Sequence, residues 1–176
     1  MNESQRLGLS ASIIHMLNEA KSWTGRMHIQ KLIYLAQCLF GLPSGYEFVL
    51  YQRGPYSFDL DADIRSLQSL GAVDIRPSPA PYGPTYVRTG LGEAISQLNP
   101  LGPEQVRKLM ALAKELGPKT ASELELLATT YYVLYEGAHE SDKDIVSRVI
   151  ALKPQFTWDQ AETALDQVRQ LESRFC

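Results

Sequence analysis

Residues 46–92 read YEFVLYQRGPYSFDLDADIRSLQSLGAVDIRPSPAPYGPTYVRTGLG, and this stretch decides the fold. The aromatic and branched residues over 46–51 predict a strand. A turn over Arg53–Tyr56, which contains glycine and proline, ends that strand. Ser57 is then a good N-cap for a helix that runs to about Leu70, because its side chain accepts a hydrogen bond from the first helical turn.

Two further strands follow this predicted helix. Residues 72–76 alternate as an edge strand does, and residues 85–88 return beside them. The loop between them, residues 77–84, is stiffened by prolines, so only the base of the ribbon needs to be paired. A helix followed by a β-ribbon is the second half of a winged helix, a fold that docks onto elongated ligands.

Helical periodicity fills the rest of the chain. Two amphipathic helices precede the strand, over 4–21 and 26–40, and the second has so broad an apolar face that it must lie between two other helices. A Pro- and Gly-rich break over 99–103 precedes a second half that is helical throughout. The sequence therefore predicts an α+β, mainly α, fold. A winged-helix-like domain with a small β-sheet or ribbon spans 1–99, and a C-terminal helical subdomain over 100–176 packs on it.

Two capping boxes mark helix starts in the second half. Thr120 with Glu123, and Thr157 with Gln160, have the spacing at which two side chains cap each other's backbone amides. Each pair stands directly before a segment with helical periodicity. We therefore expect one helix to begin just after Thr120 and another just after Thr157.

Composition describes a globular protein with no general attraction to nucleic acid. The chain has 176 residues, enough to bury a core without metal or disulfide support. Its net charge is −3 at pH 7, so contact with DNA requires a local basic patch. The N-terminus lacks a signal peptide, and no apolar run approaches membrane-spanning length. We expect a cytoplasmic monomer or homodimer without membrane contact.

No constellation of residues in the sequence points to catalysis. The three histidines, His15, His28 and His139, lie in separate segments without a partner at metal-ligand spacing. The sequence contains no phosphate-binding glycine loop, no nucleophile elbow and no metal-binding His/Glu helix motif. We therefore expect a protein that is not an enzyme and that uses no cofactor and no metal.

The helix after Ser57 carries an unusual charge for a winged helix. Asp59, Asp61 and Asp63 stand against the single cation Arg65. Three explanations compete: stabilisation of the helix dipole, an acidic docking face for a partner, and a cation site. The cation site is the weakest, because a helix spreads alternate residues around its circumference. Asp61 and Arg65 lie one turn apart, which predicts a salt bridge between them.

DNA binding is the alternative that a winged helix invites. Phosphates are neutralised by Lys or Arg, and the candidates are Arg65 on the helix with Arg76 and Arg88 on the ribbon. Three aspartates at the start of the same helix repel phosphate oxygens, which favours a protein partner. A DNA-binding transcriptional regulator that uses these arginines is the alternative function.

Several motifs carry a family resemblance. They are Gln30–Gln37, Phe48–Tyr51, Gly54–Ser57 with Leu60 and Asp61, Leu67 with Gly71–Val73, Glu123–Thr130 and Lys153–Thr157. Together they resemble the motifs of YwgA-like proteins and cover nearly the whole chain, although each motif is short. A related domain is the C-terminal half of DarG-type antitoxins, and the Panacea (SocA-like) antitoxin domains are more distantly similar.

The resemblance implies a binding function rather than a reaction. Panacea domains act as antitoxins without catalysis, and in DarG-type antitoxins the equivalent domain neutralises a DNA-modifying toxin by direct binding. This chain departs from the related Tyr-Gly-Pro motif, because Arg53 stands where that motif has tyrosine. An acidic helix is what a DNA-mimicking inhibitor needs. The resemblance therefore implies an antitoxin-like protein whose partner is such a toxin.

The predicted partner-binding residues are Arg53, Tyr56, Asp59, Asp61 and Asp63. Lys31 and Tyr34 are expected on the supporting helix as buried or half-buried scaffold. Tyr51, Tyr56 and Tyr82 are candidate aromatic anchors, and we expect the first two to pack in the interior. Charge reversal at Asp59 and Asp63 is expected to weaken partner capture and to leave thermal stability nearly unchanged.

Overall fold

The computed structural model describes residues 1–78, 83–136 and 141–175. Within these ranges the chain is mainly helical and has four short strands. The elements are α1 (Glu3–Glu19), α2 (Arg26–Phe40), β1 (Val49–Tyr51), β2 (Gly54–Tyr56), α3 (Phe58–Ser69), β3 (Val73–Arg76), β4 (Thr85–Arg88), α4 (Gly90–Ser96), α5 (Pro103–Leu116), α6 (Ala121–Glu136), α7 (Asp142–Leu152) and α8 (Trp158–Phe175). The predicted α+β, mainly α, fold is confirmed at this level.

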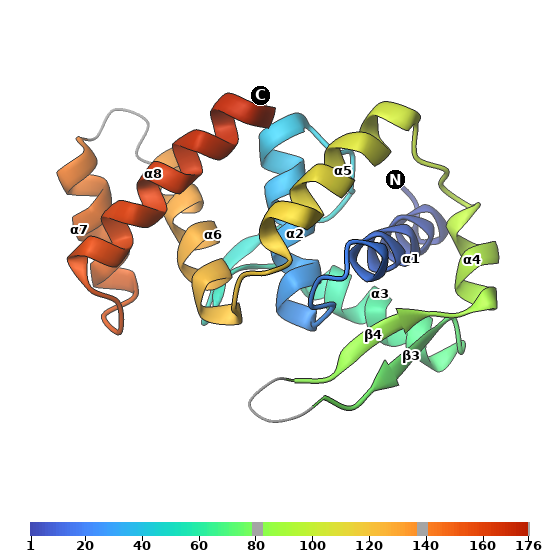
Figure 1. Ribbon diagram of the computed structural model, residues 1–176. Helices are drawn as coiled ribbons and strands as arrows, with labels where there is room; N and C mark the ends of the chain where they lie inside the picture. Colours follow the sequence, from blue (N-terminus) through green and yellow to red (C-terminus); the bar gives the residue numbers. More distant parts are fainter. Residues whose placement is uncertain (79–82, 137–140, 176) are drawn as a thin grey trace.

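The helices form two groups that α2 and α5 join (Figure 1). At one end α1 is covered by α3, α4 and α5, and β4 packs beside it. At the other end α6, α7 and α8 pack against one another. Helix α2 contacts α1, α5, α6 and α8, so the prediction that it lies between other helices is confirmed. None of the helices in the described ranges combines the length and apolar character that crossing a bilayer requires.

The strands form two separate antiparallel hairpins. In the first, β1 pairs with β2, and Tyr51 stands opposite Gly54. The predicted strand over 46–51 is therefore too long, and part of the predicted turn over Arg53–Tyr56 is a strand. The chain reverses tightly here because Gly54 has a φ of 81°, a left-handed conformation that glycine adopts without strain.

The second hairpin follows α3, as the sequence predicts. Strands β3 and β4 pair with Val73 opposite Arg88 and Arg76 opposite Thr85. Because β1 pairs with β2 instead of extending this ribbon, the sheet beside α3 has two strands. The order of helix and ribbon is thus present. Part of the predicted proline loop, residues 79–82 with the candidate anchor Tyr82, lies outside the described residues.

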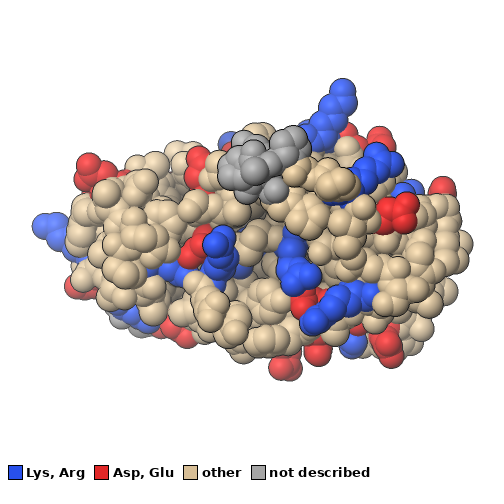
Figure 2. Space-filling view, turned by 90° about the horizontal axis from the view of Figure 1, so that it is seen from below, with Lys and Arg blue, Asp and Glu red and all other residues tan. Residues whose placement is uncertain are grey.

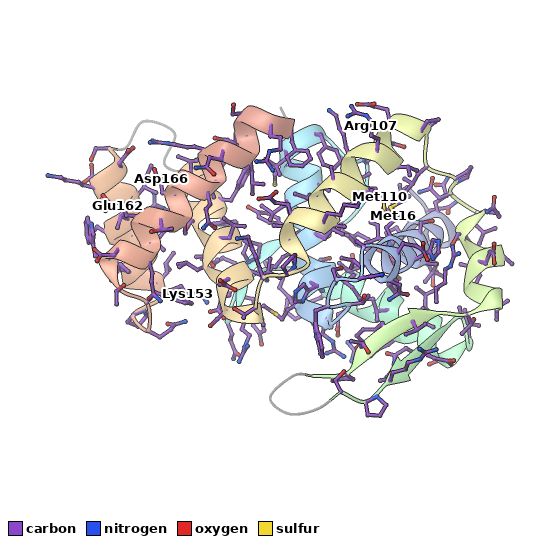
Figure 3. The ribbon with its side chains drawn as sticks, in the orientation of Figure 1. Met16, Arg107, Met110, Lys153, Glu162 and Asp166 are labelled. Carbon is purple, nitrogen blue, oxygen red and sulfur yellow. The ribbon has the colours of Figure 1, made fainter. Side chains whose placement is uncertain are left out.

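The main hydrophobic core crosses the predicted domain boundary. Leu9 of α1 and Ile33 of α2 share this core with Leu109 of α5 and Phe175 of α8. Met16 of α1 belongs to this core and Met110 of α5 packs against it; both are labelled in Figure 3. A second, smaller core lies between α6, α7 and α8 and includes Val149. The C-terminal helices therefore both pack on the first half and enclose a core of their own.

Candidate functional site

Asp63 lies in the interior and not on an acidic face. The residue is 4% exposed. Its Oδ2 accepts hydrogen bonds of 2.9 Å from Arg6 Nε and of 2.9 Å from the Tyr46 hydroxyl. Ser10 also bonds the Tyr46 hydroxyl, at 2.8 Å. Asp63 is therefore a structural carboxylate that ties α3 to α1 and to the chain before β1.

Asp61 is buried and paired with two arginines. It is 4% exposed, and it forms the predicted salt bridge with Arg65 one turn away. Its other oxygen, Oδ1, lies 3.2 Å from Nη1 of Arg26 on α2. Burial and a hydrogen bond to Asp61 raise the pKa of Tyr56, whose ring lies half-buried beside this pair. One carboxylate thus serves two guanidinium groups.

The predicted acidic docking face is therefore wrong for Asp61 and Asp63. Only Asp59 of the three aspartates is exposed. The carboxylates looked unneutralised in the sequence because Arg6 and Arg26 belong to other helices and could not be assigned to α3. Asp59 and Asp61 lie in the first turn of α3, where their negative charge stabilises the helix dipole.

The first hairpin is held from beneath by polar side chains of α2. Lys31 is fully buried, and its Nζ donates a 2.6 Å hydrogen bond to the carbonyl of Pro55. Gln30 forms two hydrogen bonds of 2.9 Å with the backbone of Ser57. The Ser57 N–H donates to Gln30 Oε1, and Gln30 Nε2 donates to the Ser57 carbonyl. The prediction that Lys31 and Tyr34 are buried scaffold is confirmed.

A buried ion pair from the C-terminal helices completes this support. Lys153, labelled in Figure 3 where α7 ends, lies 2.7 Å from Glu125 Oε1, and both residues are about 5% exposed or less. Lys153 also donates to the carbonyl of Gln52 in the hairpin turn. Gln155 donates to the same Glu125 oxygen at 3.2 Å. We call Lys31, Glu125, Lys153 and Gln155 the hairpin network.

Helix α6 also contacts the turn of the hairpin directly. A Cβ atom at Gly54 would lie 2.7 Å from Thr129 Oγ1 and 3.3 Å from the Glu125 carbonyl. Glycine is therefore required at position 54 for two reasons: the positive φ, and the close approach of α6 to its Cα atom. The turn is fixed between α2 and α6, so its outer side is presented in one orientation.

Three aromatic rings pack together on the outer side of the hairpin. The ring centroids of Tyr51 and Phe58 lie 5.3 Å apart, and those of Tyr56 and Phe58 lie 5.2 Å apart. Tyr51 is 48% exposed and Phe58 is 56% exposed. The expectation that Tyr51 packs in the interior is therefore wrong, because the opposite side of the hairpin is the one that α2 and α6 cover.

These rings and two neighbouring charged residues form what we call the hairpin surface: Tyr51, Arg53, Tyr56, Phe58 and Asp59. Arg53 is exposed and forms no hydrogen bond or salt bridge with any residue in the described ranges. Three of the predicted partner-binding residues, Arg53, Tyr56 and Asp59, thus lie together. Phe58 was missed in the sequence, although an aromatic residue in the first turn of α3 outside its buried stripe is a signal for an exposed ring.

The pKa of Lys31 is lowered to about 7, chiefly by burial; Glu125 opposes this shift, and the nearby cations Lys153 and Arg53 add to it. A lysine whose pKa lies near 7 is partly uncharged at neutral pH, and it can act as a nucleophile where a substrate reaches it. Lys31 is fully buried and bonded to Pro55, so its perturbed ammonium belongs to the support of the hairpin.

The arginines of the DNA-binding alternative are not arranged as a basic recognition surface. Arg65 is engaged by Asp61, and Arg88 donates to Ser96 Oγ at 3.1 Å on α4. Arg76 is exposed on β3. Two of the three cations are thus committed to interactions within the chain.

The structure places no metal-binding cluster in the described residues: no group of three His, Cys, Asp or Glu side chains there is arranged around one point. His28 is buried and bonds the Lys119 carbonyl through Nε2 at 2.9 Å. His139 lies outside the described residues.

The burial of Asp63 overturns the expectation that charge reversal at this position leaves thermal stability nearly unchanged, and it predicts a loss of stability on substitution. Asp63→Asn removes the charge that accepts from Arg6 and Tyr46, and it is expected to lower the free energy of unfolding by about 2 kcal/mol. Urea denaturation measures this change. The matched variant Asp59→Asn alters an exposed carboxylate on the same helix, and a change within about 0.5 kcal/mol is expected. Equal, small effects of both substitutions would show that Asp63 is not the structural carboxylate described above.

The lowered pKa of Lys31 predicts a stability that depends on pH. Between its pKa of about 7 in the folded chain and its higher value in the unfolded chain, only the unfolded state holds the proton, so stability rises with pH. The free energy of unfolding of the wild type minus that of Lys31→Met should grow by about 1 kcal/mol per pH unit between roughly pH 7.5 and 9.5. Other titrating groups cancel in this difference, and a flat difference would contradict the assignment.

No model of a known protein family matches the chain, and no curated protein matches it either. The resemblance to YwgA-like proteins therefore stays a prediction from the quoted motifs. The assignment of function depends on the hairpin surface and on the network that holds it.

Proposed function

We propose that this chain is a non-enzymatic binding protein of the antitoxin kind, which captures a protein partner with the hairpin surface. The observation that carries the proposal is the group of three packed rings, of which Tyr51 and Phe58 are each about half exposed. Aromatic side chains and arginine dominate the binding energy of protein interfaces. The hairpin surface holds three such rings and the exposed Arg53.

The support beneath the hairpin favours binding. Association costs free energy for every loop or side chain that must be ordered. The hairpin network and the close contact of Gly54 with Thr129 fix the turn before any partner arrives. Packing of Phe58 against both tyrosines restricts the rings as well. The surface is therefore largely pre-organised.

The charges of this region define the chemistry of the partner. Arg53 has no acidic counterpart in the described residues, and the nearby carboxylate Glu125 is already paired with the buried Lys153. An acidic group on the partner is therefore favoured opposite Arg53. We propose a protein partner with an apolar groove for Tyr51 and Phe58 and a carboxylate on the rim of that groove.

Mimicry of nucleic acid by α3 is not part of this proposal, because Asp61 and Asp63 are buried. A toxin, including one that modifies DNA, stays the partner that the resemblance implies. A winged-helix-like N-terminal part and a cytoplasmic location belong to the same proposal. The order of α3, β3 and β4 supports the first of these.

The test begins with capture of partners from cells of the native host by the purified chain. The captured protein is then purified, and its affinity is measured by calorimetry for wild type and for Tyr51→Ser/Phe58→Ser. We expect the double variant to weaken binding by at least about tenfold, because hot-spot truncations cost roughly 1–2 kcal/mol or more each. Co-expression of the captured protein should inhibit growth, and the wild-type chain should relieve that inhibition.

Leu91→Ser is the matched control, since Leu91 is an apolar side chain of α4 that is 49% exposed. It should leave affinity and growth unchanged. Unaltered affinity of the double variant, with its fold intact by circular dichroism, would reject the hairpin surface. A captured protein that does not impair growth would reject the antitoxin function.

A further inference from the structure

Helix α2 begins without the cap that helix starts usually have. Its N-cap is Gly25, which makes no side-chain hydrogen bond. The backbone N–H groups of Arg26, Met27 and His28 have no hydrogen-bond partner among the residues that the structure describes. A serine, threonine or aspartate at an N-cap satisfies such groups with its own oxygen. Gly25 leaves these donors open to an oxygen from elsewhere.

The charge at this helix start also departs from the usual pattern. The first turn of α2 holds no acidic residue, and Arg26 occupies its first position. The positive end of a helix dipole disfavours a cation there. Arg26 shares the Asp61 carboxylate with Arg65, so positive charge remains uncompensated. A negatively charged group at this position would relieve both features.

Two adjoining cavities, each of about 430 Å³, open at this helix start. The first is lined by Gly25, Arg26, Met27, His28 and Arg53, and the second by Lys119 and Thr120, among others. No Asp or Glu is among the described residues that line either cavity. Figure 2 views the molecule from the side where α2 begins, and it shows Lys and Arg side chains on both sides of a hollow.

His28, which lines both cavities, has a buried polar atom without a partner in the described part of the chain. His28 lines both of them, is 4% exposed, and places Nε2 2.9 Å from the carbonyl oxygen of Lys119, which also lines the second cavity. With Nε2–H donating to that carbonyl, Nδ1 is an acceptor, and it has no hydrogen-bond partner in the described part of the chain. Buried acceptors are rarely left unpaired, so a hydroxyl or amino group of a ligand fits here.

Aromatic walls complete the cavities. Trp23 lines both, and Tyr86 lines the first. The indole of Trp23 lies directly over the N-cap, because a Cβ atom at Gly25 would be 2.8 Å from Trp23 Nε1. A flat, weakly polar ring packs well against such side chains.

We propose that the cavities at the start of α2 bind a phosphorylated nucleoside. The phosphate lies at the N–H groups of Arg26–His28 and beside the guanidinium of Arg53. The base packs against Trp23, and a hydroxyl or amino group of the ligand donates to His28 Nδ1. A free mononucleotide and the 5′-phosphorylated end of a nucleic-acid strand present this same chemistry.

Nuclear magnetic resonance of the full chain tests the site. Titration with adenosine 5′-monophosphate should shift the backbone amides of Arg26, Met27 and His28 and the indole N–H of Trp23, in a saturable way. The start of α5 is the matched control, because its N-cap Gly102 also lacks a side-chain cap and lies outside the cavities. Its amides should not move. Adenosine and inorganic phosphate should each bind at least about tenfold more weakly than the nucleotide.

Substitution of an arginine separates this site from general attraction of anions. Arg53→Met should weaken binding of the nucleotide by about tenfold, the usual effect of one charge-assisted contact. Arg76→Met removes an exposed arginine of β3 outside the cavities and should leave it unchanged. Equal loss from both substitutions would overturn the proposal. So would the absence of saturable shifts at the amides of Arg26–His28.

A short DNA strand, with and without a 5′-phosphate, identifies the source of the ligand. Tighter binding of the phosphorylated strand than of the mononucleotide assigns the site to strand ends, and the reverse assigns it to free nucleotides. Binding of both strands alike, with no effect of the phosphate, would overturn the site. The Tyr51→Ser/Phe58→Ser variant should bind the nucleotide normally, so failure here is distinct from failure of the hairpin surface.

Discussion

The buried ion pair between Glu125 and Lys153 is the interaction on which the hairpin depends. Removing charges from water is costly, and a buried pair stabilises a fold little compared with apolar side chains of the same volume. The contribution of the pair here is to fix the orientation of the hairpin. Lys153 also donates to the Gln52 carbonyl, and Lys31 donates to that of Pro55. Two backbone oxygens of one hairpin are thus held by two buried lysine side chains, which an apolar core cannot do.

The same principle explains why the acidic appearance of α3 was misleading. A carboxylate is judged by the cations that surround it in space, and Arg6 lies 57 positions from Asp63 in the chain. Periodicity identifies the buried stripe of a helix from its apolar residues, and Asp61 and Asp63 fall outside that stripe. They are buried because α1 and α2 each bring a guanidinium to them. The charge of an isolated helix is therefore a poor guide to the charge of its surface.

Features that depend on local sequence were predictable, and features that depend on distant packing were not. The helices that begin after Thr120 and Thr157 are present, and both capping boxes form as expected. The ribbon after α3 is also present. The exposure of Tyr51 was not predictable, because a three-residue strand does not reveal which of its sides α2 and α6 will cover. Aromatic composition indicated the strand, and tertiary contacts decided its exposed side.

Several departures from local rules occur together at the start of α2. The helices α1, α3, α4 and α7 have an N-cap side chain that accepts from the first turn, and in α5 the side chain of Gln105 bonds the N-cap amide. At α2 an uncapped start, a cation in the first position and an unpaired imidazole nitrogen occur within four residues. A natural fold keeps such unfavourable features where an external group offsets them. Because α2 also supports the hairpin through Gln30 and Lys31, one helix carries buried polar groups that are fully bonded and, at its start, backbone and imidazole groups that are not bonded within the described residues.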